Sequence, residues 1–466
     1  MGFGVADFSS IGLFGDHRRA VRGAWVFDRI VATGSLVIRQ IGGDRAGEIA
    51  AHRFFDSPEV TPEEIIETLS ERTARQCAGR TIVAPQDTTE INFGGRDLAR
   101  RGLGCAGNGL DLGFFIHPVI AVDAADETVI GLLDAQIWTR DQANDGSARR
   151  DRRKRKPDDK ESARWLEGAR RAASCCTEAD RLIVVGDRES DIYTVFAGRP
   201  EGADLVVRAS QNRAVTEHGL LFSSAQNWPV LDVYAVPVPS RGPGDKGRTA
   251  VVRLKAGTVE IKRPQNGADP ADPKTVALTL VEVEEVGAPP GTTPLHWRLL
   301  STLPAKDADG AREIVRFYRL RWRIEQTFRA LKTDGLGLEE VQMQEASRLF
   351  KLATLGLAAA VRTIQLVDAR DGGPRMATDV AGPDLIRAAA AISPTLEGKT
   401  QRQKNLHPPE SLAWLSWIVA RLGGWNCYYK PPGPKTIRAG WDRLAAMAEG
   451  YLIAQSQTLT AIPPDV

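Results

Sequence analysis

The chain has few of the residues that build zinc-held or disulfide-held folds. It contains 5 cysteines and 6 histidines among 466 residues. None of the cysteines forms a CxxC pair, and no paired histidines accompany them. Neither a structural zinc site nor a disulfide framework is therefore indicated, and a reducing compartment fits this composition.

Long apolar runs and a large net charge are also missing. No stretch approaches the ~20 apolar residues that span a bilayer, and the first residues lack the basic-then-apolar pattern of a signal peptide. We therefore expect a cytoplasmic protein. Lysine and arginine number 61 against 59 acidic residues, for a net charge of +2. An attraction to nucleic acid would have to come from local basic faces, because a phosphate backbone responds to the nearby potential.

Two local basic stretches are present. Arg18, Arg19 and Arg22 follow Asp16 near the start of the chain. A denser run of arginine and lysine extends over 149–156. Charge alone makes this second run more typical of a solvated loop than of a binding site.

The rest of the composition is that of packed protein, with 42% hydrophobic and 26% charged residues. A chain of this length predicts two to four domains. Helical patterns extend to about residue 75, with a turn signal at 56–58 and a new helix that Thr61 can cap. Short β-type patterns follow at 81–84, 114–122 and 128–138.

The second half alternates between the two patterns. A helical stretch at 161–173 leads into an apolar run of buried-strand type at 181–185. From about 205 to 300, β-branched alternation with Gly and Pro turns predicts an inserted β-subdomain. Helix is expected again at 311–332 and 345–368. We predict three domains, namely a helical domain over 1–75, an α/β core over 76–370 and a helical domain over 371–466.

Two aspartates, Asp87 and Asp187, each follow an apolar strand directly. Taken singly, a strand-end aspartate is more often a helix cap or a turn former. Facing carboxylates on adjacent strand ends would repel one another unless a cation stood between them. Magnesium ions are commonly held in this way.

A third carboxylate stands in the segment 318–332. On one α-helix, positions 318, 321, 325 and 332 share a stripe that carries Tyr318, Arg321, Glu325 and Lys332. Considered alone, this is more typical of a surface helix with i,i+4 ion pairs.

Three motifs taken together resemble a known family. They are Asp-Thr-Thr at 87–89, Asp-Arg-Glu-Ser-Asp-Ile at 187–192, and Tyr-x2-Arg-x3-Glu-x6-Lys at 318–332. The sequence resembles DDE transposases of the insertion-sequence-4 family, in the branch close to the transposon Tn-five enzyme. Segments 8–10, 15–19 and 51–54 resemble that family's end-recognition domain, and 419–424 resembles its C-terminal dimerisation region.

The resemblance implies an RNase H-like core, a mixed sheet flanked by helices, with a β-domain inserted between the second aspartate and the glutamate. The spacing of 138 residues (325 minus 187) leaves room for that insertion. It further implies a cut-and-paste transposase that nicks transposon ends, forms and opens a hairpin, and joins the 3′ ends to target DNA. Its partners would be double-stranded DNA and, on DNA, a second copy of the chain. Such a protein would associate with the nucleoid.

The resemblance also assigns roles to individual residues. Asp87, Asp187 and Glu325 would be catalytic and hold two Mg²⁺ ions, for which Mn²⁺ could substitute. Glu189 and Asp191 belong to the second motif but are expected to be structural. The expected DNA contacts are Tyr318, Arg321, Lys332, Trp297, Arg208, Arg18, Arg19, Arg22 and Arg53.

Alternatives to this interpretation stay open. Trp297 could be a core aromatic of the β-domain, and each arginine an ordinary surface charge. The whole chain could instead be a non-catalytic DNA-binding regulator or a metal-dependent nuclease of the same fold. Clustered carboxylates argue against the regulator, because a protein that only binds DNA has no need for them beside the phosphates.

Overall fold

The N-terminal part of this computed structural model is a group of helices. The structure describes residues 10–94, 100–107, 111–140, 161–217, 219–238, 247–266, 268–332 and 336–460, with side chains to residue 454. Asp16, Asp44 and Thr61 each cap a helix by accepting a backbone N–H, as short polar side chains do at helix starts. The helices are α1 (His17–Thr33), α2 (Ile38–Gly42), α3 (Arg45–Asp56) and α4 (Pro62–Cys77).

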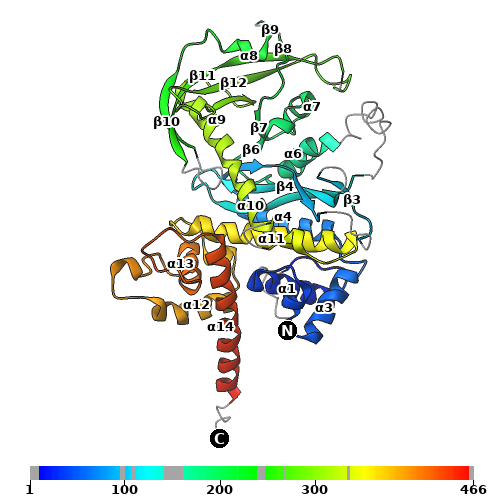
Figure 1. The fold of residues 1–466 in the computed structure, drawn as a ribbon, viewed down its shortest axis with the longest axis vertical. Coiled ribbons are helices and arrows are strands. Elements are labelled where there is room, and N and C mark those ends of the chain that lie inside the picture. The colour runs from blue at the N-terminus through cyan, green and yellow to red at the C-terminus, as the bar shows by residue number, and fades with distance from the viewer. Residues whose placement is uncertain are drawn as a thin grey trace.

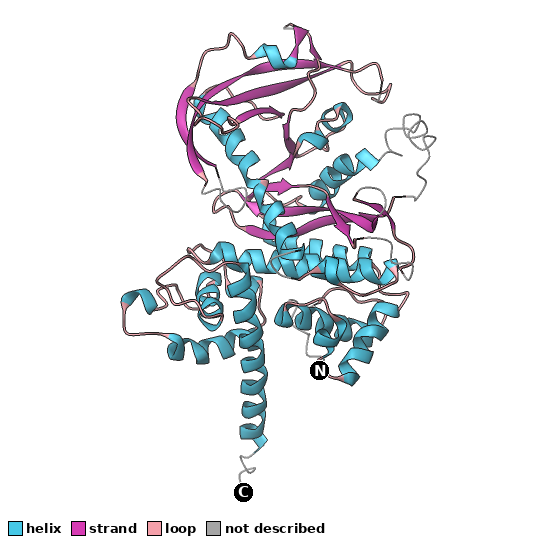
Figure 2. Ribbon diagram, in the orientation of Figure 1, coloured by secondary structure: helices cyan, strands magenta, loops and turns pink. Residues whose placement is uncertain are grey.

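A mixed sheet forms the centre of the molecule (Figure 2). Strand β4 pairs antiparallel with β1, β2, β3 and β5, whereas β1, β6 and β7 run parallel to one another. The sheet has apolar residues such as Val83 and Ile183 buried within it, as expected for parallel strands covered on both faces. The strands are β1 (Thr81–Pro85), β2 (Thr89–Asn92), β3 (Gly104–Ala106), β4 (Asp111–Asp123), β5 (Val129–Trp138), β6 (Arg181–Gly186) and β7 (Ala203–Arg208).

The β-rich segment continues this sheet instead of forming a separate one. Strand β13 pairs with β7, so the strands after β7 extend the sheet to 13 strands (Figure 1, top). Strand β7, which spans the expected start of the insertion near 205, pairs in parallel with β6. The added elements are β8 (Ala214–Val215), β9 (Gly219–Leu220), α8 (Leu221–Ser224), β10 (Asp232–Val238), β11 (Arg248–Lys262), β12 (Thr275–Glu285) and β13 (His296–Ser301).

Helices flank the sheet, and one of them differs from the prediction. The single helix expected over 311–332 is two helices that meet at Arg321. There the backbone changes to i→i−3 hydrogen bonds, from Arg321 N to Tyr318 O and from Ile324 N to Arg321 O, which tighten the chain locally. The flanking elements are η2 (Glu161–Ala163), α6 (Arg164–Cys175), η3 (Arg188–Ser190), α7 (Tyr193–Ala197), α9 (Ala308–Leu320), α10 (Trp322–Lys332) and η4 (Leu338–Glu340).

The long helix α11 (Ala346–Ala369) lies between the sheet and the helical parts of the chain (Figure 1). The sequence predicts no stretch apolar enough to span a bilayer, but among the described residues α11 has the length and composition of a membrane-spanning helix. Inside the protein, 83% of its apolar window is buried. Residues such as Leu352 and Leu355 have no exposed surface. This helix therefore serves as the central core helix on which the other parts pack.

The described residues of the C-terminal part, up to residue 460, form helices and loops. Its last helix, α14, extends away from the body, and Arg438 in its first turns donates to Gly34 O of the N-terminal part at 3.2 Å (Figure 1). The mixed sheet with flanking helices is consistent with the expected RNase H-like core. The C-terminal elements are η5 (Ala377–Asp379), α12 (Pro383–Leu396), η6 (Gln401–Gln403), α13 (Leu412–Leu422) and α14 (Pro434–Thr460).

Candidate active site

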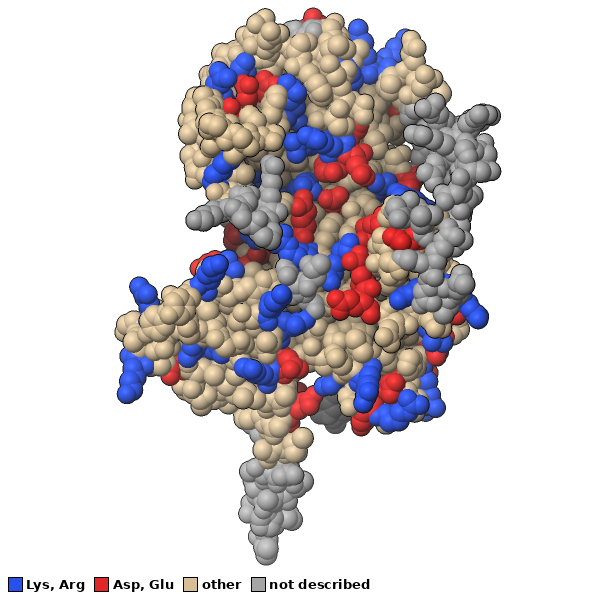
Figure 3. Space-filling model, in the orientation of Figure 1, with Lys and Arg blue, Asp and Glu red and all other residues tan. Residues whose placement is uncertain are grey.

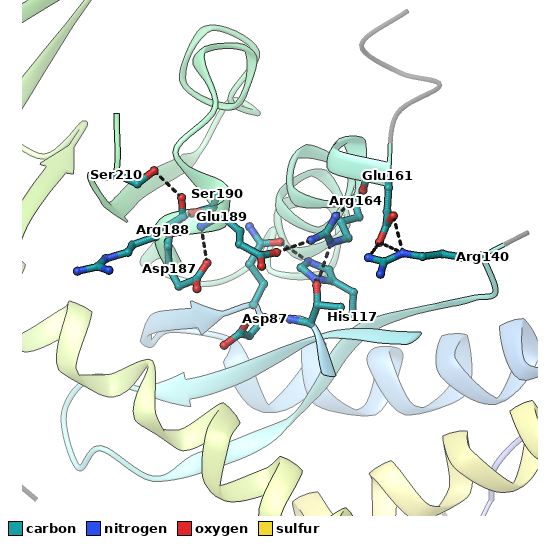
Figure 4. Close-up of polar contacts among 12 residues, drawn as sticks. Asp87, His117, Arg140, Glu161, Arg164, Asp187, Arg188, Glu189, Ser190 and Ser210 are labelled. Carbon is teal, nitrogen blue, oxygen red and sulfur yellow. Dashed lines mark hydrogen bonds and ion pairs between the residues drawn. The ribbon is translucent and has the colours of Figure 1, made fainter. Parts of the chain in front are cut away.

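The register of the sheet brings the two strand-end aspartates together. Strands β1 and β6 are parallel neighbours in which Pro85 lies beside Val185. Each aspartate comes two residues later, so Asp87 and Asp187 leave adjacent strands at the same edge. Figure 4 shows both side chains at this edge.

Each aspartate is also held by its own local backbone. Asp87 Oδ1 accepts from Thr88 N at 2.8 Å, and Asp187 Oδ1 accepts from Glu189 N at 2.8 Å. The second contact caps the short helix η3. In both residues the second carboxylate oxygen is left for other partners.

Arg321 joins Glu325 to this pair. Its Nη1 donates to Asp87 Oδ2 at 2.8 Å, and its Nη2 donates to the Glu325 carboxylate one helical turn away. Arg321 stands at the junction of α9 and α10, and Glu325 stands in the first turn of α10. The structure therefore places Asp87 and Glu325 on opposite sides of one guanidinium.

The electrostatics of Asp87 reflect its burial first and the neighbouring carboxylates second. Burial and the nearby Asp187 carboxylate raise the pKa of Asp87 to about 7. Arg321 lowers that pKa, and Glu325 raises it further. A carboxylate that is buried beside two others favours either a proton or a cation, and Arg321 supplies part of the positive charge in the protein alone.

The donor set fits a hard divalent cation, because all three side chains offer carboxylate oxygens. Within the described ranges, no group of three or more His, Cys, Asp or Glu side chains stands close enough to hold a metal as the chain is arranged. In this arrangement Arg321 pairs with both Asp87 and Glu325. A shared ion requires the guanidinium to move from between the carboxylates.

Tyr318 and Trp297 lie beside this cluster. The two rings meet edge to face with centroids 5.5 Å apart. Tyr318 is buried, whereas Trp297 is only partly buried at the margin of the core. Both interpretations of Trp297 keep support, since the ring packs on the core and also has an accessible part. Arg208 is in the same region and donates to His296 O at 3.4 Å.

Lys332 ends α10 farther from the carboxylates. Its Nζ donates to Glu90 O and pairs with Glu339 at 3.0 Å. Glu90 is three residues beyond Asp87, so Lys332 lies along the same loop and strand as the site. Sequence reasoning missed Glu339, which lies in a short helix without a motif.

The N-terminal arginines belong to a different region. Arg18 and Arg53 are exposed, and Arg19 and Arg22 are partly exposed. They stand on α1 and α3, which pack beneath α11, away from the sheet edge that carries the aspartates (Figure 1). The structure does not bring them to the acidic cluster. The basic run 149–156 and segment 8–9 lie outside the described residues.

The remaining acidic residues of the second motif have structural contacts. Asp191 is buried and accepts from Ser210 N at 2.7 Å and Gln211 N at 2.8 Å, and it also pairs with Arg213. It thereby ties η3 to the segment that leaves β7. Glu189 is largely exposed and pairs with Arg164 at 2.8 Å.

The visible face of the molecule carries both charges. Figure 3 shows acidic side chains gathered along the middle of this face, with lysine and arginine side chains on either side. An acidic centre with basic flanks suits a substrate whose phosphates are gripped on both sides of a cation-binding point.

Comparison with known families agrees with this geometry. A family model described as the transposase DDE domain matches residues 116–362. The match covers 247 of 466 residues (362 − 116 + 1), more than half of the chain. The chain belongs to the transposase DDE domain family. It is thus a DDE transposase, an enzyme of DNA transposition that acts on DNA, and such enzymes generally use divalent metal ions. The matched region includes Asp187 and Glu325 and begins after Asp87.

Proposed function

We propose that this chain is a cut-and-paste transposase of the insertion-sequence-4 family, similar to the transposon Tn-five enzyme. In this proposal it nicks transposon ends, forms and opens a hairpin, and joins the 3′ ends to target DNA. The observation that carries the proposal is that Asp87 and Asp187 leave adjacent strands at one edge of the sheet, and that Arg321 pairs with both Asp87 and Glu325.

The three carboxylates are the proposed metal ligands. Two Mg²⁺ ions, or Mn²⁺ in their place, would supply charge neutralisation at the phosphate and activation of the attacking oxygen. The raised pKa of Asp87 supports this role, because burial and the neighbouring Asp187 carboxylate both disfavour an uncompensated charge on Asp87, and a bound cation would offset both effects.

The protein's cations and aromatic rings would then position the DNA. The planar fork of Arg321 matches two phosphate oxygens as well as two carboxylates. Lys332 offers a second positive charge along the same strand, and Tyr318 a hydroxyl. Trp297, edge to face with Tyr318, would accept an unstacked base, which eases the sharp bend of a hairpin.

The outer parts of the chain have proposed roles as well. Arg18, Arg19, Arg22 and Arg53 in the domain over 1–75 would contact transposon-end DNA, and Arg208 would contact DNA from the β-rich segment. The helical domain over 371–466 would pair two copies on DNA. The protein would work in the cytoplasm, at the nucleoid.

The test is cleavage of the element's own end DNA in Mg²⁺, with the wild type compared with Asp187→Ala. The proposal predicts that the variant binds the DNA and does not cut it. Asp180→Ala is the matched control, because Asp180 is an exposed aspartate immediately before the same strand. Unchanged cleavage by Asp187→Ala would refute the metal role.

Two other functions give different outcomes in the same gel. A DNA-binding regulator would bind ends without cutting them in either form. A metal nuclease of the same fold would cut but yield no strand-transfer product. Joined product from the wild type is therefore the result that separates the transposase from both.

A further inference from the structure

A closed chain of hydrogen bonds stands directly behind the two aspartates (Figure 4). It starts at Arg164, the first residue of α6, whose side chain is 10% exposed. Its Nε donates to Thr88 Oγ1 at 2.8 Å, and its Nη2 donates to Glu189 Oε2 at 2.8 Å. Its Nη1 donates to Glu161 O at 2.7 Å. One guanidinium thus connects the residue after Asp87 with the loop after Asp187.

The chain continues from Thr88 through a buried histidine. Thr88 Oγ1 lies 2.9 Å from His117 Nδ1, and His117 Nε2 lies 3.1 Å from Gln86 Oε1. Gln86 Nε2 donates to Trp165 O at 3.0 Å. Trp165 follows Arg164 in α6, so the chain closes on itself and encloses both neighbours of Asp87.

The chemistry of the members fixes the direction of every bond. The Gln86 amide must point its nitrogen at Trp165 O, an acceptor, so its oxygen faces His117. His117 Nε2 therefore carries the proton and donates. Burial and the nearby Arg164 hold the pKa of His117 well below its usual value, which keeps the ring neutral and leaves Nδ1 as an acceptor. Thr88 then donates to Nδ1 and accepts from Arg164.

Close packing restricts the side chains that form this chain of hydrogen bonds. The rings of His117 and Trp165 meet edge to face with centroids 4.6 Å apart, and His117 has no exposed surface. Gly168 of α6 allows the helix to approach, because a Cβ there would lie 2.5 Å from Gln86 Oε1 and 3.0 Å from Val119 Cγ2. The close contact therefore fixes the distance between α6 and the end of β1.

We propose that Arg164 and Thr88, through neutral His117 and Gln86, are positioning residues that hold the Asp87 and Asp187 loops at the separation needed to share a divalent ion. The proposal rests on the proposed function of the acidic site. It adds a support that none of the three motifs includes in full, since Arg164 and His117 lie outside all of them.

A direct role in DNA binding fits Arg164 less well. All three of its nitrogens already donate to protein oxygens, and only one partner, Glu189, is largely exposed. The Glu189 contact contributes the least, because an ion pair with an exposed partner is screened by water. The Thr88 contact connects Arg164 to the residue next to Asp87. A substitution of Thr88 therefore tests the positioning role more directly than a substitution of Glu189.

The test measures binding of Mn²⁺ alone to the full-length protein, with free Mn²⁺ followed by electron paramagnetic resonance. Thr88→Val keeps the side-chain shape and removes the hydroxyl, whereas Thr88→Ser keeps the hydroxyl. Arg164→Gln removes the guanidinium group. Arg171→Gln is the matched control, an exposed arginine on the same helix that pairs with Glu167 at 3.5 Å. Thermal unfolding in EDTA reports the folded fraction of each variant.

We expect Thr88→Val and Arg164→Gln to bind Mn²⁺ about 10–100-fold more weakly, the usual cost of losing a group that orients metal ligands. Thr88→Ser should keep most of the affinity, and Arg171→Gln should match the wild type. The deciding quantity is the Mn²⁺ affinity of each folded molecule. A merely structural defect lowers the fraction of folded molecules but leaves this affinity unchanged.

The outcomes distinguish this inference from the proposed function. If wild type binds Mn²⁺, Asp187→Ala does not, and both Thr88→Val and Arg164→Gln bind like wild type, the positioning role is overturned and the acidic site stands. If wild type and Asp187→Ala bind Mn²⁺ equally, the acidic site itself fails and the inference falls with it. A loss of end-DNA binding by Arg164→Gln with unchanged Mn²⁺ affinity would make Arg164 a DNA contact and would also contradict the inference.

Discussion

Replacing Arg321 tests whether its guanidinium stands where a metal cation would stand. Arg321→Met keeps much of the apolar stem and removes two charge-assisted hydrogen bonds, to Asp87 Oδ2 at 2.8 Å and to Glu325. The side chains of Arg321, Asp87 and Glu325 are 15%, 18% and 32% exposed. The Asp87 contact is thus the better shielded of the two.

The expected cost follows from that burial. Hydrogen bonds to charged groups contribute about 1.5–3 kcal/mol each, and the Glu325 contact is discounted for its exposure. We expect the free energy of unfolding in EDTA to fall by about 2–4 kcal/mol, because three carboxylates are left without a cation between them. An ion present at ten times its Kd would restore about 1.4 kcal/mol.

The assay is urea unfolding in EDTA and in Mg²⁺. Mg²⁺ should stabilise Arg321→Met more than the wild type, because in the wild type the ion competes with the guanidinium. Arg323→Met is the matched control, since Arg323 pairs at 2.6 Å with Asp368, a nearly fully buried carboxylate away from the cluster. That variant should lose stability without recovering it in Mg²⁺. Equal stabilisation of wild type and Arg321→Met by Mg²⁺ would refute the reasoning.

Three further predictions concern single residues. Burial raises the pKa of Asp134 to about 6. Because this folded-state value exceeds the unfolded one, the residue's contribution to stability is complete below about pH 4 and is lost as the pH rises through 6. In urea unfolding, the free energy of unfolding of Asp134→Asn should therefore exceed that of wild type by up to about 3 kcal/mol at pH 8 and equal it near pH 4. A difference that does not change with pH would contradict this. Asp191→Ala should lower the free energy of unfolding by about 3–5 kcal/mol, because it leaves Arg213, whose side chain is 12% exposed, without its carboxylate; a loss under 1 kcal/mol would contradict the structural role. Trp297→Leu should slow hairpin formation about 10–100-fold while nicking stays near normal, measured on denaturing gels, because base stacking contributes about 1–3 kcal/mol; equal slowing of both steps would favour the core-aromatic role.

Much of the secondary structure was visible in the sequence. The apolar runs before Asp87 and Asp187 predicted β1 and β6, because buried parallel strands carry near-continuous apolar residues. That the two strands are neighbours in matching register was not visible, since pairing depends on contacts about 100 residues apart in the chain. The prediction that the carboxylates approach one another therefore depended on the resemblance.

The parts that escaped prediction depend on local backbone or on distant contacts. Periodicity ran unbroken through 311–332, so nothing marked the helix break at Arg321, whose guanidinium pairs with Asp87. Arg164 and His117 meet Thr88 from 76 and 29 residues away. Neither residue stands in a recognisable spacing. The domain boundaries and the DNA contacts of the N-terminal arginines stay predictions.

The most direct measurement is the anomalous scattering of Mn²⁺ in crystals of the protein bound to its end DNA. The account predicts anomalous peaks directly coordinated by oxygens of Asp87, Asp187 and Glu325, with Arg321 moved from between the carboxylates onto a phosphate. Ordered DNA with no Mn²⁺ peak at these three side chains, or a peak held by other residues, would contradict it.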